Sequence, residues 1–90
     1  MLSSSPVPRL GVGMKFRFDA VRAAWVVLGP ERLFLPDDHA VEVLKLVDGN
    51  RTVADIAMLL AARFDAPAAT IEADILPMLH GLAASGAVRL

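Results

Sequence analysis

The fold is decided by residues 67 to 85, which read PAATIEADILPMLHGLAAS. The stretch carries the spacing of one buried helical face at Ile71, Ile75, Met78, Leu79 and Leu82. Pro77 lies within this pattern, where proline removes one hydrogen bond and crowds the preceding turn, at a cost of ~3 kcal/mol. We therefore expect a long helix that either kinks before Pro77 or divides into two pieces, with Gly86 as its stop.

Two shorter helices are predicted before it. The first begins at Asp37 or Asp38, since a carboxylate accepts free N–H groups and faces the positive end of the helix dipole. Gly49 is its expected end. The second begins at Thr52 and Asp55, which resemble a capping box. Each helix has one apolar stripe: Ala40, Val41, Leu44 and Val47 in the first, and Val53, Ile56, Leu60 and Phe64 in the second.

Three short strands are predicted before the helices. Residues 15 to 19, KFRFD, alternate polar and apolar, which puts Phe16 and Phe18 on the core face. Residues 22 to 28 are apolar on both faces and predict a central strand. A Gly-Pro-Glu turn then leads into a third strand over residues 32 to 35.

The order of these elements predicts one α+β domain. It is winged helix-turn-helix-like, with three short antiparallel strands followed by three helices. Residues 1 to 13 are rich in serine, proline and glycine, so we expect them to form a flexible tail. The winged-helix-like domain then covers residues 14 to 90.

Composition excludes several classes of function. The chain has 90 residues, no cysteine and a net charge of -1. It therefore has no thiolate nucleophile, disulfide or cysteine metal site, and no general attraction to nucleic acid or anionic membranes is expected. The hydrophobic fraction is 56%, but the longest apolar runs are too short to cross a bilayer. We expect a cytoplasmic protein.

No set of side chains predicts catalysis. An enzyme needs a nucleophile, an acid–base pair or a metal cluster. His39 follows Asp37 and Asp38, but helix capping explains those two carboxylates better than a metal site does. His80 lies opposite the apolar stripe and is expected to be solvated. We predict a protein that is not an enzyme and has no metal or cofactor.

The element order is typical of DNA-binding proteins, whereas the charges favour a peptide. DNA readers need cations on the docking face. Residues 67 to 85 contain no lysine or arginine, and their charges are Glu72 and Asp74. A peptide could instead add a strand to the edge of the third strand. Plain core remains an alternative for the apolar stripe, because most such stripes only bury a sheet.

Short motifs follow one another from about residue 8 to 88, and their order and spacing are specific together: Pro8-Arg9-Leu10, Phe18-Asp19 with Arg22, Val27-Leu28, Pro30-Glu31-Arg32, Val43-Leu44, Leu46-Val47-Asp48-Gly49, Arg51-Thr52-Val53, Asp55-Ile56-Ala57, Ala66-Pro67, Ile71, Asp74-Ile75 and Leu79 to Leu82. In these motifs the sequence resembles the PqqD family, peptide chaperones of pyrroloquinoline quinone biosynthesis. Gly11-Val12-Gly13 departs from the pattern, since the family usually carries an Arg-Gly pair there. No role of that arginine is carried over.

The resemblance implies a recognition element for a ribosomally made precursor peptide. Such a protein presents the peptide to a radical S-adenosylmethionine enzyme. In the family, the peptide lies along the third strand and third helix, which implies a site at Arg32, Leu33, Phe34, Leu35, Ile71, Asp74, Ile75, Met78 and Leu79. Related domains serve other peptide-modification pathways, and a DNA-binding regulator is the remaining alternative. The expected state is a monomer or a weak or swapped homodimer, with neither nucleic acid nor membrane as a partner.

Overall fold

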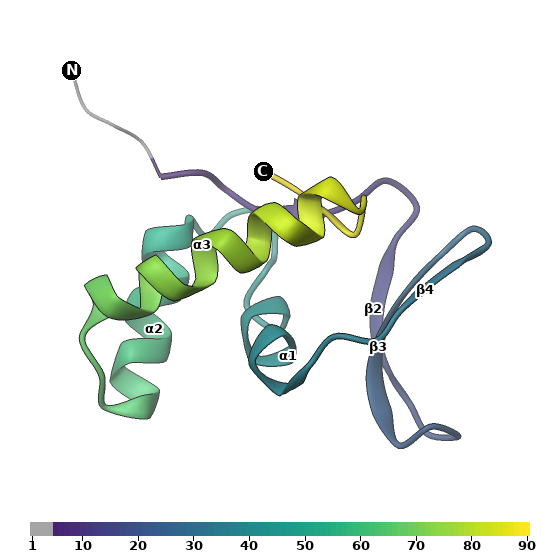
Figure 1. Cartoon of the computed structure of the whole chain (residues 1–90), viewed down its shortest axis with the longest axis horizontal. Helices are drawn as coiled ribbons and strands as arrows, with labels where there is room; N and C mark the ends of the chain where they lie inside the picture. Colours follow the sequence, from purple (N-terminus) through teal and green to yellow (C-terminus); the bar gives the residue numbers. More distant parts are fainter. Residues whose placement is uncertain (1–4) are drawn as a thin grey trace.

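A computed structural model of the protein describes residues 5–90, with five strands and three helices in that range. Their order is β1 (Arg9–Leu10), β2 (Lys15–Asp19), β3 (Ala24–Gly29), β4 (Arg32–Phe34), α1 (Asp38–Leu44), α2 (Val53–Phe64), α3 (Ala68–Ala84) and β5 (Val88–Arg89). Figure 1 shows α1 between the β2–β4 sheet and the packed pair α2 and α3. The predicted α+β class, three antiparallel strands and then three helices, is confirmed.

The three-stranded sheet has the order β2-β3-β4 and is antiparallel throughout. The central position predicted for the second strand is therefore correct. That strand starts at Ala24 rather than at Arg22, because Asp19 organises a turn before it. The Asp19 carboxylate accepts the N–H groups of Val21 and Arg22 and forms an ion pair with the Arg22 guanidinium at 2.9 Å. The third strand ends at Phe34, one residue before the expected position.

The aromatic side chains of the sheet are only partly buried. Phe16 and Phe18 share one face of β2, as predicted, but Phe18 is 50% exposed and lies outside the core. Trp25 pairs with Phe18 across the strands and stacks on Phe16, with ring centroids 4.8 Å apart. The Lys45 ammonium lies 5.2 Å from the centroid of the Trp25 ring. These rings form the outer end of the sheet beside α1.

Helix α1 is shorter than expected. Asp37 is its N-cap and accepts the backbone N–H of Ala40 at 2.8 Å. The helix ends at Leu44 instead of continuing to Gly49, because Asp48 starts a separate turn. The Asp48 carboxylate accepts the N–H groups of Asn50 and Arg51, and Gly49 takes φ +79° within that turn. Gly49 thus reverses the chain after the helix rather than capping it.

Helix α2 begins as predicted. Thr52 accepts the N–H of Asp55, and the Asp55 carboxylate accepts the N–H of Thr52, which completes a capping box. Val53, Ile56 and Leu60 of the expected stripe are buried. Phe64 is not, because it is the last residue of the helix and remains 53% exposed.

Helix α3 is one continuous helix of 17 residues that contains Pro77, so of the two alternatives, a kink or a division into two pieces, the division does not occur. Pro77 and Ala73 are both exposed. Proline cannot bond the Ala73 carbonyl, and at this exposed position water can take the place of the missing N–H. Gly86 ends the helix as predicted, with φ +89°, while the N–H of Ala87 bonds the Leu82 carbonyl at 2.9 Å.

The N-terminal segment differs from the expectation of a tail over residues 1 to 13. β1 pairs with β5, and Pro8 is fully buried. The Pro6 carbonyl accepts the N–H of Val53, and Ser5 Oγ accepts that of Ala54. These two N–H groups have no partner inside α2, so the segment satisfies groups that a helix start leaves open. Residues 1 to 4 lie outside the described residues.

The core joins all three helices to the sheet. Its fully buried side chains include Val27 of β3, Leu44 of α1, Ile56 of α2, Leu79 of α3 and Val88 of β5. Phe16 and Phe34 pack against this cluster from the sheet. Among residues 5–90, no helix is long and apolar enough to span a membrane.

We predict that Gly11→Ala destabilises the protein and that Gly81→Ala does not. A Cβ on Gly11 would overlap the carbonyl oxygen of Gly86, which is backbone and cannot rotate away. Overpacking of this kind costs about 1–3 kcal/mol. A Cβ on Gly81 meets no atom within 4 Å, and alanine is the better helix former by about 0.5–1 kcal/mol. Urea unfolding of both variants measures the difference, and equal stabilities would contradict the close crossing at Gly11.

We also predict an acid-sensitive contribution from Asp48. Backbone N–H bonds from Arg51 and Asn50 hold the pKa of its carboxyl below the ordinary value. Its stabilisation is therefore complete above the ordinary carboxyl pKa of about 3.9 and is lost as pH falls through the lowered value. The stability advantage of the natural protein over Asp48→Asn should shrink on acidification. Urea unfolding from pH 6 to 2.5 measures it, and a pH-independent difference would refute the assignment.

Candidate functional site

The outer edge of β4 is available for another strand. In the sheet order β2-β3-β4, β4 pairs with β3 on one side only. The other short strands of the described range, β1 and β5, pair with each other. An edge strand keeps a row of unpaired backbone N–H and C=O groups, which a guest backbone can satisfy. The third strand is thus an edge, as the sequence reading required.

The side chains of β4 divide between two faces. Phe34 pairs with the fully buried Val27, so its ring lies on the core face. Leu33 pairs with Leu28 on the opposite face and is 40% exposed, and Leu35 is 63% exposed. Leu33 therefore does not occupy the inward position on β4. Strand alternation gives the inward position to Phe34 instead.

Arg32 connects β4 with the end of α3. Its guanidinium lies 4.9 Å from the centroid of the Phe34 ring. A Cβ built on Gly86 would lie only 3.0 Å from Arg32 Nη1, so the guanidinium rests directly over that glycine. The side chain of Arg32 thus lies between the Phe34 ring and the glycine that ends α3.

The α3 residues expected at the site fall into two groups. Ile75 and Leu79 are 4% and 0% exposed, so their main contacts are with the core. Ile71 and Met78 are half-buried, and Asp74 is exposed. Leu79 is therefore simply a residue of the core. The half-buried Ile71 and Met78 and the exposed Asp74 can contact a ligand without any unfolding of the helix.

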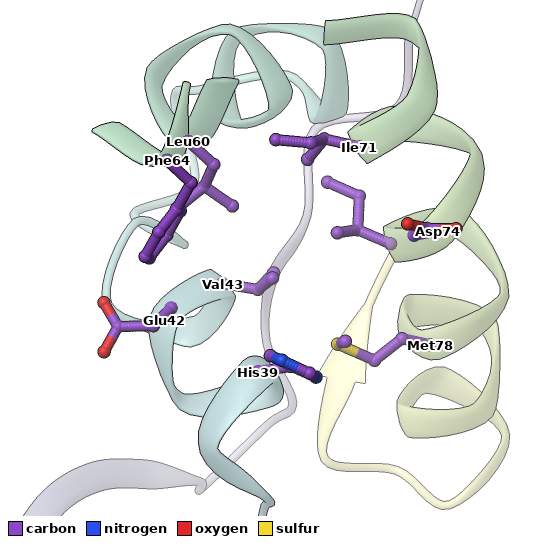
Figure 2. A pocket seen from close by; sticks show the side chains of 9 residues that line it. His39, Glu42, Val43, Leu60, Phe64, Ile71, Asp74 and Met78 are labelled. Carbon is purple, nitrogen blue, oxygen red and sulfur yellow. The ribbon is translucent and has the colours of Figure 1, made fainter. Parts of the chain in front are cut away.

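A cavity of about 330 Å³ opens between the three helices. We call it the three-helix cavity, and its lining residues are His39, Glu42 and Val43 of α1, Leu60 and Phe64 of α2, and Ile71, Asp74, Ile75 and Met78 of α3. Figure 2 shows these side chains around the hollow, with His39 and Met78 reaching toward each other from α1 and α3. Four of the nine predicted site residues line it, and no β4 residue does. The structure therefore separates the predicted site into the β4 edge and this cavity.

The two carboxylates at the three-helix cavity differ in their partners. Burial beside the cavity raises the pKa of Glu42, but hydrogen bonding and charge from Arg63, together with Lys45, outweigh it and leave the pKa below its ordinary value. Arg63 and Lys45 both form ion pairs with Glu42, the latter at 3.5 Å. No described side chain forms an ion pair with Asp74. The Asp74 carboxylate is consequently free to meet a cation.

The histidines show no arrangement for metal binding. His39 and His80 are both exposed, in agreement with a solvated position for His80. Within residues 5–90, no three side chains among histidine, aspartate and glutamate come together at metal-binding distance. The Asp37 carboxylate serves α1 as its cap, as predicted.

Five lining residues of the three-helix cavity were missed by sequence reasoning. They are His39, Glu42, Val43, Leu60 and Phe64. Val43 and Leu60 fit any buried helical stripe, so their positions carry no separate signal. Phe64 did carry a signal, because a large apolar residue at the last position of a helix has few neighbours on its own helix that could cover it.

The profile of the family described as Coenzyme PQQ synthesis protein D (PqqD) matches residues 24–88. The match includes β3, β4, all three helices and the start of β5. It begins after β2, so the first hairpin strand and the N-terminal segment lie outside it.

Curated relatives extend the similarity toward the N-terminus. The bifunctional coenzyme PQQ synthesis protein C/D of Methylorubrum extorquens is 60% identical over 81 residues, which is 90% of this chain but only 22% of that protein. The PqqA binding protein of Rhodopseudomonas palustris strain HaA2 is 47% identical over 85 residues, or 94% of this chain and 83% of the relative. The chain thus corresponds to a small part of the bifunctional protein and to most of the second.

Two solved structures share the fold. The solution structure of the PqqD truncation of Methylobacterium extorquens PqqCD, described as a stand-alone RiPP recognition element, has a TM-score of 0.80 and 54% identity, and the alignment covers 100% of this chain and 96% of that one. The crystal structure of PqqD from Xanthomonas campestris has a TM-score of 0.61 and 38% identity with full coverage of both chains. Profile, relatives and structures agree, and the chain belongs to the PqqD family.

Proposed function

We propose that this chain binds the PqqA precursor peptide and holds it for modification in pyrroloquinoline quinone biosynthesis. One relative of near-equal length is named PqqA binding protein, and a structural neighbour is described as a recognition element for ribosomally made, modified peptides. The structural observation that carries the proposal is the open outer edge of β4. This edge offers backbone N–H and C=O groups to a peptide strand, and that pairing does not depend on particular side chains of the peptide.

The proposed peptide site runs along β4 and α3. Peptide backbone groups would bond the free edge of β4, while Leu33 and Leu35 meet peptide side chains as cross-strand neighbours. Arg32 and Asp74 supply opposite charges at the two sides. Ile71 and Met78 supply apolar surface on α3, and Phe34, Ile75 and Leu79 support them from the core.

The protein would act without catalysing a reaction. A bound peptide held near a radical S-adenosylmethionine enzyme meets that enzyme at a raised effective concentration, as with any tether. Ordering the peptide costs about 2–5 kcal/mol, which strand hydrogen bonds and apolar contacts must offset. This role places the protein in the cytoplasm, where its ribosomally made partner is produced. Helix α3 has no lysine or arginine that could contact phosphate, so its charge does not support the alternative that the protein binds DNA.

Replacing Leu35 or Leu33 by aspartate should weaken peptide binding by about tenfold or more, which corresponds to about 1.4 kcal/mol. An aspartate at either position puts a carboxylate beside the added strand, where it must be desolvated. Fluorescence anisotropy of a labelled synthetic PqqA peptide, titrated with each variant, measures the affinity.

Val21→Asp is the matched control, because Val21 is 96% exposed in the turn between β2 and β3, away from the β4 edge. It should bind as the natural protein does. Equal affinities for all three variants would refute the edge as the peptide site. Light scattering of the peptide-free protein shows whether a second copy competes for the same edge.

Presentation to the enzyme has a separate test. Isothermal titration of the radical S-adenosylmethionine enzyme with the chain should give binding both with and without PqqA peptide, and the three components should elute together in gel filtration. Leu35→Asp should remove the peptide from the complex while the enzyme still binds. Loss of enzyme binding in the same variant would mean that the β4 edge contacts the enzyme instead.

A further inference from the structure

The β2–β4 sheet has a second face that none of the described helices covers. Strand alternation puts Phe16, Val27 and Phe34 on the face that packs into the core. The strand residues between them point the other way, and we call their surface the outer sheet face: Lys15, Arg17 and Asp19 of β2, Ala24, Val26 and Leu28 of β3, and Leu33 of β4. Figure 1 shows α1, α2 and α3 together on the opposite side of the sheet.

The centre of the outer sheet face is apolar. Val26 and Leu28 lie there, and neither belongs to the core cluster or to the side chains packed against it. Leu28 is half-buried, and its cross-strand partner Leu33 is 40% exposed. Arg17 is the cross-strand partner of Val26, and the stem of an arginine can cover an apolar neighbour while its guanidinium stays in water. Adjacent apolar side chains that remain accessible on one face of a small domain are typical of an interaction surface.

Cations border this apolar centre along β2. Lys15 and Arg17 are exposed, and neither has an ion-pair partner among residues 5–90. Asp19, on the same face, is already paired with Arg22 at 2.9 Å. The outer sheet face therefore presents two cations whose charge the described residues do not neutralise. A surface that carries carboxylates beside apolar side chains is complementary to it.

The position of the β4 edge indicates which partner uses this face. A peptide strand added to β4 extends the sheet, and its side chains alternate between the two faces. Those on the inner face are turned toward the helices, whereas those on the outer face stand beside Leu33. An enzyme can reach the outward side chains without displacing a helix if it approaches from the outer side. A protein that covered Lys15, Arg17 and Leu28 would therefore lie next to the bound peptide as well.

The cations of β2 lie too far from the β4 edge for the added strand itself to use them. Neighbouring strands are about 4.8 Å apart, so three spacings separate the added strand from β2 by roughly 14 Å. A folded partner is wider, since a standard protein interface covers about 800 Å² on each side. Such an area includes both β2 and the edge at β4.

We propose that the enzyme that modifies the peptide docks on the outer sheet face, with acidic side chains against Lys15 and Arg17 and apolar side chains against Leu28. This inference rests on the proposed function, since it names the surface by which the peptide-loaded chain meets that enzyme. The sheet face holds the enzyme and the sheet edge holds the peptide, with Leu33 at the border between them. The two partners are thus bound side by side and do not compete.

Charge reversal separates the two binding events. The double variant Lys15→Glu with Arg17→Glu should weaken binding of the purified radical S-adenosylmethionine enzyme about tenfold, mainly through slower association, because like charges then meet. Its affinity for a labelled PqqA peptide should equal that of the natural chain. Biolayer interferometry with immobilised chain measures enzyme binding, and fluorescence anisotropy measures peptide binding. Circular dichroism confirms that the variant is folded.

The double variant Arg9→Glu with Arg89→Glu is the matched control. These two arginines are exposed, lie opposite each other on the β1–β5 ladder and have no ion-pair partner among residues 5–90. The control changes the net charge by the same amount and should bind the enzyme normally. Equal losses in both double variants would mean that net charge alone governs the encounter, and the docking surface would be refuted.

Carbodiimide cross-linking tests the contact itself. The reagent joins a lysine amine to a nearby carboxylate, and the chain has two lysines, Lys15 and Lys45. Lys45 is paired with Glu42 and lies over the Trp25 ring, away from the outer sheet face. In the enzyme complex, mass spectrometry should find Lys15, and not Lys45, joined to an aspartate or glutamate of the enzyme. Lys15→Arg keeps the charge but removes the amine, so this variant should bind normally and lose the cross-link.

Each result decides a separate claim. If the enzyme binds the Lys15→Glu, Arg17→Glu variant as tightly as the natural chain, or is cross-linked to Lys45 instead, the docking surface is wrong while the proposed function stands. If that variant loses the peptide and keeps the enzyme, the outer sheet face belongs to the peptide and the inference fails. If the natural chain binds no enzyme at all, the proposed presentation fails together with the inference. Should the variant not fold, the cross-link of the natural chain decides.

Discussion

Burial of one face of α3 is the constraint on which the rest of the structure depends. Leu79 is fully enclosed, and Ile75 beside it is nearly so. Through the same apolar cluster α3 holds α2, α1 and the inner side of the sheet. The neighbours of these two residues on the helix surface, Ile71 and Met78, are only half covered. The helix therefore organises the core with one part of its apolar surface and leaves another part only half covered.

Local chemistry made much of the fold predictable from the sequence. Thr52 and Asp55 form the predicted capping box, Asp37 caps α1, and Gly86 stops α3. Each of these signals acts within a few residues, so it can be read without knowing the fold. The end of α1 was misplaced because Asp48 and Gly49 belong to a turn, and glycine alone does not tell a turn from a helix cap.

Elements that depend on distant partners could not be predicted. β1 and β5 are two residues long, and each exists because the other lies beside it. Ser5 and Pro6 are ordered by N–H groups of a helix that starts some fifty residues later. A Ser- and Pro-rich composition at the start of a chain gives no sign of such contacts.

The candidate site was predicted in its elements but not in its geometry. The edge position of β4 agrees with the sequence analysis. However, alternation turned Leu33 away from the helix and placed Phe34 inward, and a strand of three residues is too short for its pattern to fix that choice. The three-helix cavity could not be predicted, since its walls come from three separate segments of the chain.

The pairing of β1 with β5 has a mechanical consequence. The two strands are antiparallel, with Arg9 opposite Arg89 and Leu10 opposite Val88, so the chain enters and leaves at the same end of this ladder. A pull on the two ends would load the ladder one pair at a time, a geometry that resists force weakly. Ser5 and Pro6 would first have to peel from the start of α2. Force applied to the two ends of the chain would thus separate the β1–β5 ladder pair by pair before it loaded the packed helices.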